Sequence, residues 1–163
     1  MRNDDFEVVY NMYYQQLFLY ARSLTSNKED AKDVLANAFV KAYLSFSGGN
    51  VRAWLYKVVR NECYNLYREK KHEINLDVSL IELMGSEDSI LGKIITDEKK
   101  AWLYKKILEL KPRDREIMLL SLKNELTDKE ISIITNVSLE NVRVIKHRVK
   151  MHLMENAKED YHE

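Results

Sequence analysis

Residues 127–153 constrain the fold of this chain more than any other segment. Their sequence, TDKEISIITNVSLENVRVIKHRVKMHL, opens with a capping box in which Thr127 and Glu130 can each satisfy a backbone N–H of a first helical turn. Asn136 suits a left-handed turn, and Ser138 suits the cap of a second helix. The segment therefore predicts two helices joined by a tight turn, which is the helix-turn-helix arrangement.

The second of these helices is two-faced. Apolar residues at helical spacing should face inward, namely Val142, Ile145, Val149 and Leu153. The opposite face is basic, with four Lys/Arg and no Asp/Glu in residues 141–152. A short helix followed by a basic one is the geometry that enters a DNA major groove, so nucleic acid is the first hypothesis for a ligand.

Each outward-facing residue of this helix is suited to contact a particular part of the DNA. We expect Arg143 on base edges, the β-branched Val144 against a thymine methyl, and Arg148 and Lys150 on phosphates, with His147 on the same face. The alternative is an ordinary basic surface helix, which the same composition would also produce.

The composition restricts the fold and the chemistry. Four glycines and one proline in 163 residues favour an all-α fold. The single Cys63 excludes an internal disulfide and a cysteine-cluster metal site, and it fits a reducing cytoplasm. We find neither a signal peptide nor an apolar run that could cross a bilayer, so we expect a cytoplasmic protein without membrane insertion. The four histidines lie near no ligand partner, and no phosphate loop or nucleophile motif is present, so we expect no metal, cofactor or enzymatic activity.

The formal net charge of zero conceals a strongly uneven distribution. Residues 51–72 hold six Lys/Arg against two Asp/Glu, whereas residues 73–99 hold seven Asp/Glu against two Lys. Because electrostatic potential acts within about 10 Å at physiological salt, two basic surfaces can form although the total charge cancels.

The first half of the chain predicts three or four helices. Apolar residues recur at helical spacing from Phe6 to Leu24, and a capping box of Ser26 and Glu29 opens the next helix. Gly48-Gly49 should end it, and a two-faced helix should follow over residues 51–71. We expect two small helical domains at residues 1–72 and 98–158, an acidic linker at 73–97 and a tail at 159–163.

Three segments together resemble a bacterial RNA polymerase sigma factor of the sigma-70 family, of the extracytoplasmic-function (ECF) type. They are EDAKDVLANAFVKAY (29–43), VRAWLYKVVRNECYNLYREK (51–70) and the stretch from LKPRDREIMLL to the end of the helix-turn-helix (110–153). The resemblance covers nearly the whole chain, and the string WLYKVVRN ahead of a helix-turn-helix is specific. It implies a promoter-specificity subunit without catalysis, with region 2 at residues 1–72 and region 4 at residues 98–158.

The resemblance also implies partners. The helix at 29–43 is similar to the region 2 helix that docks on the β′ clamp of core RNA polymerase, and region 4 is expected at the β flap and on the −35 promoter element. Members of this family are commonly held inactive by an anti-sigma factor, which becomes a candidate partner. The residues that match the clamp-binding positions are Asp30, Asp33, Asn37 and Phe39.

Region 2 of the family melts and reads the −10 element and holds a flipped base beside the loop before its long helix. Stacking on an aromatic ring stabilises an unstacked base by ~1–3 kcal/mol, and basic side chains bind the phosphates. The periodicity places Tyr56 and Tyr64 on the polar side of the helix and Trp54 on the buried side, where core packing is the alternative role. The matching residues are Phe46, Trp54, Tyr56, Arg60, Asn61, Tyr64 and Arg68.

A stand-alone transcriptional regulator is the alternative function. It would bind duplex DNA through the helix-turn-helix and sense a signal through the N-terminal half. The aromatic and basic helix at 51–71 argues against this reading, because a protein that binds only duplex DNA needs no platform for unstacked bases.

Overall fold

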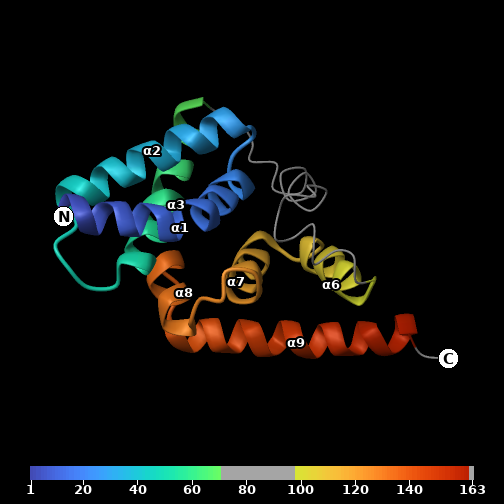
Figure 1. The fold of residues 1–163 in the computed structure, drawn as a ribbon. Helices are drawn as coiled ribbons and strands as arrows, with labels where there is room; N and C mark the ends of the chain where they lie inside the picture. The colour runs from blue at the N-terminus through green and yellow to red at the C-terminus, as the bar shows by residue number, and fades with distance from the viewer. Residues whose placement is uncertain (71–97, 162–163) are drawn as a thin grey trace. The chain divides into compact units, whose positions relative to one another are not determined.

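The computed structural model describes residues 1–70 and 98–161, which form seven α-helices and contain no strand (Figure 1). This confirms the all-α prediction. The chain divides into two compact units, Met1–Lys93 and Ile94–Glu163, and each has its own apolar core. The expected linker at 73–97 lies outside the described residues.

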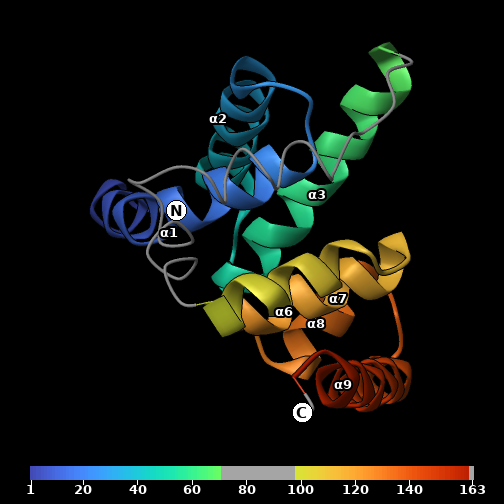
Figure 2. The ribbon, with the colours of Figure 1, turned by 90° about the vertical axis from the view of Figure 1, so that its right-hand side faces the viewer.

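The described residues of the N-terminal unit form three helices that all pack on one another: α1 (Asn3–Ser23), α2 (Lys28–Ser45) and α3 (Val51–Lys70) (Figure 2). The first two form an antiparallel hairpin, since the rings of Phe6 near the start of α1 and Tyr43 near the end of α2 lie 5.3 Å apart. The fully buried side chains at the centre come from all three helices and include Leu17, Leu35, Leu55 and Tyr56.

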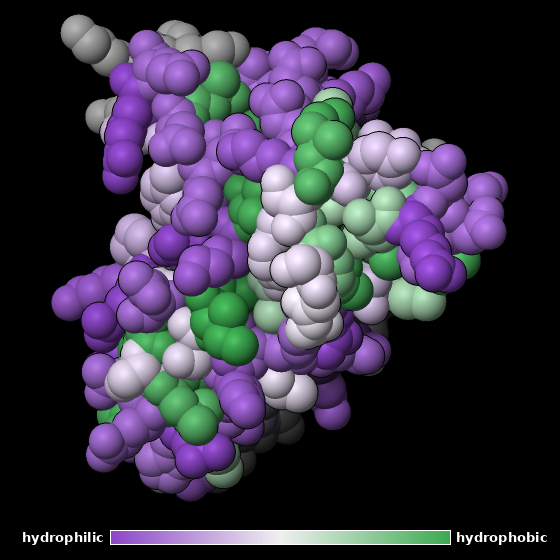
Figure 3. Space-filling view, turned by 90° about the vertical axis from the view of Figure 1, so that its left-hand side faces the viewer, coloured by the Kyte–Doolittle hydropathy of each residue, from purple (hydrophilic) through white to green (hydrophobic). Residues whose placement is uncertain are grey.

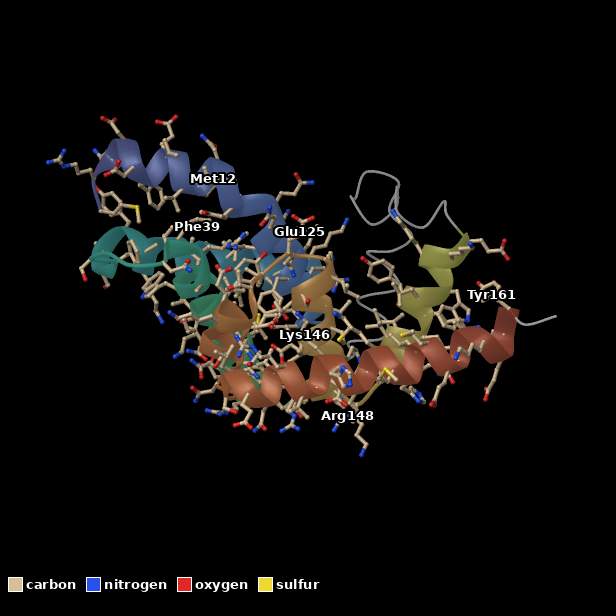
Figure 4. All side chains as sticks on the ribbon, turned by 90° about the horizontal axis from the view of Figure 1, so that it is seen from below. Met12, Phe39, Glu125, Lys146, Arg148 and Tyr161 are labelled. Carbon is tan, nitrogen blue, oxygen red and sulfur yellow. The ribbon has the colours of Figure 1, made fainter. Side chains whose placement is uncertain are left out.

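An aromatic cluster holds α1 against α2. Phe39 of α2 contacts the rings of Phe6, Tyr10 and Tyr14, with centroid separations of 6.1, 4.8 and 6.2 Å. These three α1 residues are spaced four apart, so a single stripe of the helix presents them all. Figure 4 labels Phe39 on α2, where it faces α1.

The caps of α2 and α3 come from asparagines. Asn27 is the N-cap of α2, and its side chain accepts a hydrogen bond from the Asp30 N–H at 2.8 Å. The expected capping box of Ser26 and Glu29 is therefore wrong by one residue, because the neighbouring Asn27 satisfies the same orphan N–H groups. In the loop before α3, Gly48 and Gly49 have φ values of +133° and +96°, which L side chains rarely adopt.

The C-terminal unit contains four helices: α6 (Glu98–Leu108), α7 (Pro112–Leu122), α8 (Asp128–Thr135) and α9 (Leu139–Tyr161). Pro112 occupies the first turn of α7, as expected from its missing N–H. The Arg115 guanidinium folds back and donates to the Leu110 carbonyl at 3.0 Å, which satisfies an oxygen just beyond the end of α6.

The tight turn between α8 and α9 forms as the sequence predicts. Thr127 and Glu130 make the reciprocal capping box, and Asn136 has a left-handed φ of 64°. Ser138 accepts a hydrogen bond from the Asn141 N–H at 3.1 Å and so caps α9. The helix-turn-helix prediction is confirmed.

Helix α9 continues to Tyr161, beyond the expected domain end at residue 158. Its last turn contacts α6: the Trp102 indole N–H donates to Asp160 at 2.6 Å, and the rings of Trp102 and Tyr161 lie 5.7 Å apart (Figure 4). The extension is stable because α6, which lies about 60 residues earlier in the sequence, supplies these contacts.

Candidate nucleic-acid interface

The outer face of α9 carries the residues expected to meet DNA. Arg143, Val144, His147, Arg148 and Lys150 are all exposed, whereas the four predicted inward residues of α9 are all buried. Val144 keeps 53% of its surface exposed although it is apolar and β-branched. The predicted orientation of the helix is confirmed, and its exposed face combines cations with apolar side chains, since Met151 is exposed as well.

Acidic residues of the two preceding helices hold the cations of α9. Asp128, the first residue of α8, contacts the Lys146 ammonium at 2.5 Å and lies 3.9 Å from Nε of Arg143. Asp114 of α7 accepts from the Arg148 guanidinium at 2.7 Å. Figure 4 labels Lys146 and Arg148 on α9. Three cations of α9, Arg143, Lys146 and Arg148, are therefore paired with acids of the same unit.

Sequence reasoning missed both aspartates. Asp128 is 18 residues from Lys146, and Asp114 is 34 residues from Arg148, so no local pattern connects them. One signal was present, because Lys146 directly follows Ile145 and so lies at the edge of the inward stripe of α9. The structure shows the consequence: Ile145 packs in the core and Lys146 reaches Asp128.

Most of the candidate residues on α3 form one stripe. Arg60, Tyr64 and Arg68 lie about one turn apart along the helix, and Asn61 lies next to Arg60; Asn61 and Arg68 are exposed. The Arg60 guanidinium stacks over the Tyr64 ring, 4.7 Å from its centroid. A stacked guanidinium and ring present a flat, cationic surface, which suits an unstacked base and its phosphate.

Tyr56 is not part of this stripe. Its side chain is fully buried, and its ring lies 5.1 Å from the ring of Tyr20 on α1. The expectation that Tyr56 lies on the polar side is wrong, because α3 packs against α1 and α2 at once and the buried arc of the helix is correspondingly wide. In this structure Tyr56 offers no surface to a base.

The loop before α3 borders an open depression in the surface. The rings of Phe46 and Trp54 meet edge to face with centroids 5.5 Å apart. Trp54 is half-buried, so its burial is intermediate between that of a core residue and that of a residue fully open to a base. Phe46 also lines the depression, which has a volume of about 830 Å³. Its other lining residues come from the start of α1 and from the glycine loop, and include Arg2, Asp5, Val9 and Gly49.

The candidate clamp residues on α2 separate into two pairs. Asp33 and Asn37 are exposed, and Val40 and Leu44 extend the same surface with 57% and 72% exposure. Asp30 and Phe39, at 7% and 3% exposure, are buried. Their assignment to a clamp-binding surface is corrected here: Asp30 engages Asn27, and Phe39 fills the aromatic cluster between α1 and α2.

Lys123 is a half-buried lysine that directly follows α7. Burial lowers the pKa of its ammonium from the usual 10.5 to about 8. Below pH 8 the folded chain keeps a charge in a poorly solvated position. Between pH 8 and 10.5 the unfolded chain still binds this proton and the folded chain does not, so stability should rise with pH in that window.

We expect Lys123→Met to raise the free energy of unfolding of the C-terminal unit at pH 7 by about 1–3 kcal/mol. The gain should shrink as the pH approaches 10, where the lysine is neutral in the folded chain. Urea unfolding at both pH values, followed by Trp102 fluorescence in a Trp54→Phe background, measures this. The exposed Lys129→Met is the matched control, and an equal gain from that change would contradict the burial argument.

Two further features were sought in the described residues, a cluster of metal ligands and a membrane-spanning helix. Within residues 1–70 and 98–161, no three His, Cys, Asp or Glu side chains gather as a metal site would require. In the same ranges, no helix has the length and apolar character needed to span a membrane. The face in Figure 3 is mostly hydrophilic, with hydrophobic side chains in separate patches.

Comparison with known proteins identifies both halves of the chain. Residues 9–73 match the family model Sigma-70 region 2, and residues 100–153 match Sigma-70, region 4. The RNA polymerase sigma factor YlaC of Bacillus subtilis (strain 168) is 30% identical over 162 residues, covering 94% of this chain and 92% of that protein. The ECF RNA polymerase sigma factor SigM of the same organism is 29% identical over 148 residues, covering 89% and 90%.

The fold has a counterpart among solved structures. The structure of CnrH in complex with the cytosolic domain of CnrY aligns with a TM-score of 0.63 and 19% identity, covering 98% of this chain and 91% of that one. At this identity the likeness concerns the fold alone. A match to region 2 beside region 4 does not favour the stand-alone regulator. The chain belongs to the sigma-70 family as an ECF sigma factor, a transcription initiation factor that binds core RNA polymerase and directs it to promoters.

Proposed function

We propose that the stripe on α3 engages the −10 element as it opens, and that the outer face of α9 reads the −35 element. The observation that carries this assignment is the exposed face of α9, where Arg143, Val144, His147, Arg148 and Lys150 lie together on a helix-turn-helix. The two faces sit on separate compact units, so each can contact its own stretch of promoter DNA.

For the −10 element, the α3 stripe supplies what an opened strand needs. Arg60 stacked on Tyr64 offers a planar cationic surface, and Arg68 continues the positive charge toward the end of the helix. Asn61 presents an exposed carboxamide that can pair with a base edge. Phe46, whose ring contacts that of Trp54, lines the open depression, which we propose as the place that receives a flipped base.

For core polymerase, we propose that the exposed strip of α2 docks on the β′ clamp. Asp33 and Asn37 supply polar contacts, and Val40 and Leu44 supply apolar area that would otherwise remain in water. Region 4 would contact the β flap. An anti-sigma factor that covers the same surfaces is a further proposed partner; the CnrH structure contains the cytosolic domain of CnrY.

Run-off transcription tests the proposal as a whole. The purified chain, mixed with core RNA polymerase and fragmented genomic DNA of the source organism, should start transcripts at discrete sites that share two upstream elements. Core enzyme alone should not produce these transcripts. Initiation without a shared upstream element near −35 would contradict the role proposed for α9.

Asn61→Ala should slow promoter opening more than it weakens the closed complex. The carboxamide contacts a base only after the base leaves the duplex, so its loss should affect the opening step, by roughly tenfold. Stopped-flow measurement of opening, beside electrophoretic measurement of closed-complex affinity, separates the two steps. Asn65→Ala, also exposed on α3 one turn further along, is the control. Equal losses in both measurements would count against the assignment of Asn61.

Arg143→Ala should relax selectivity at one −35 position, at a cost of ~1–3 kcal/mol for the preferred base pair. The reason is that a guanidinium reading a base edge distinguishes base pairs, whereas a phosphate contact does not. The measurement is initiation from a promoter set in which each −35 base pair is varied in turn. A uniform loss across the set would mark Arg143 as a phosphate contact instead.

A further inference from the structure

We propose that Asp128 of α8 is a positioning residue that sets −35 selectivity by orienting the Arg143 guanidinium. The inference rests on the proposed function of α9. Asp128 is the first residue of its helix, where a carboxylate is favoured by the helix dipole, and it lies beside the outer face of α9. Its side chain is therefore held at the interface without needing DNA.

The carboxylate of Asp128 uses one oxygen for each of two cations. Oδ1 contacts the Lys146 ammonium at 2.5 Å, and Oδ2 lies 3.9 Å from Nε of Arg143. The Lys146 and Asp128 side chains are only 19% and 28% exposed, so this pair is less screened than an ordinary surface ion pair. Asp128 thus contacts both cations at once, with one carboxylate oxygen beside each.

The atom of Arg143 that faces Asp128 matters for recognition. A guanine is read by two parallel donors of a guanidinium fork, most often to O6 and N7. The nitrogen of Arg143 that lies 3.9 Å from Asp128 is Nε. An acid at Nε limits rotation of an arginine that is otherwise 65% exposed, so less conformational freedom is lost when the fork meets a base.

Asp114 is a matched control for Asp128, because its loss should have a different effect on DNA binding. It binds a terminal nitrogen of Arg148, the residue that we assign to a phosphate, at 2.7 Å. A phosphate must compete with Asp114 for that nitrogen. Loss of Asp114 should therefore strengthen binding to all sequences alike, whereas loss of Asp128 should change which sequences are preferred.

The test uses holoenzyme made from the full chain and core polymerase, with a library varied over the −35 element of a promoter found by run-off transcription. Asp128→Asn should lower discrimination at the Arg143-dependent position roughly five- to tenfold. Lys146→Met, which removes the other partner of Asp128 and leaves the carboxylate to Arg143, should preserve that discrimination. Asp114→Asn should raise initiation across the library without reordering it. In the Arg143→Ala background, Asp128→Asn should have no further effect on discrimination.

Several results would overturn the inference. Equal loss of discrimination in Asp128→Asn and Lys146→Met would show that the ion pair only holds α8 against α9. Normal discrimination in Asp128→Asn, with loss in Arg143→Ala, would reject Asp128 while leaving the proposed function intact. No change in discrimination from Arg143→Ala would reject both. If Asp128→Asn loses its folded structure by circular dichroism, Asp128→Ser replaces it, since serine also suits a helix start, and the same expectations apply.

Discussion

Tyr56→Ala should cost the N-terminal unit about 3–5 kcal/mol in its free energy of unfolding. Tyr56 is fully buried between α3 and α1, and its ring contacts that of Tyr20 at 5.1 Å. Truncation removes the ring from a close-packed interior and leaves a cavity that the surrounding helices can only partly fill. A loss of this size is a large part of the 5–15 kcal/mol that stabilises a typical domain.

The chain contains its own control and its own reporter for this experiment. Tyr67 lies on the same helix with 38% of its surface exposed, and Tyr67→Ala should change stability by about 0.5 kcal/mol or less. The two tryptophans, Trp54 and Trp102, lie in different units. In a Trp102→Phe background, urea unfolding followed by fluorescence therefore reports the N-terminal unit alone.

Tyr56→Phe distinguishes a core role from a base contact. This variant keeps the ring, so we expect it to retain most of the wild-type stability and to open promoters at an unchanged rate. Slower promoter opening with normal stability would instead support a contact between Tyr56 and the −10 element. Equal and small stability losses from Tyr56→Ala and Tyr67→Ala would contradict the burial seen in the structure.

Charge reversal on α2 should separate folding from polymerase binding. Asp30→Lys should destabilise the N-terminal unit by about 3–5 kcal/mol, because it places a lysine where a buried carboxylate accepts from the Asn27 side chain at 3.2 Å. Asp33→Lys, three residues along on the exposed side, should change stability by about 0.5 kcal/mol or less. Under the proposed function it should weaken core polymerase binding roughly tenfold, or about 1.4 kcal/mol.

Both effects can be measured on the same proteins. Urea unfolding gives the stability, and titration of the variants into labelled core polymerase gives the affinity. Asp33→Asn, which removes the charge without reversing it, should fall between wild type and Asp33→Lys in affinity. Wild-type affinity in Asp33→Lys would exclude this part of α2 from the polymerase interface, and wild-type stability in Asp30→Lys would contradict the buried environment of Asp30.

The local features of this protein could be predicted from sequence because they depend on residues a few positions apart. The capping box of Thr127 and Glu130, the left-handed Asn136 and the inward stripe of α9 each lie within one segment. Such features arise from backbone hydrogen bonds and helical periodicity, which the order of residues specifies directly. The cap of α2 was misplaced by one residue because Ser26 and Asn27 are adjacent and both are good caps.

Only the tertiary structure decided how wide each buried face is and which distant charges meet. Tyr56 is a core residue because two neighbouring helices cover it, and Phe39 is one because α1 presents a stripe of rings to it. The sequence of a single helix does not show which helices pack against it. The contacts of Asp128 with Lys146 and of Asp114 with Arg148 depend on how α7, α8 and α9 cross. The sequence alone thus determined the helices, the family and the charged face of α9, whereas helix packing determined which cations of α9 form ion pairs and with which acids.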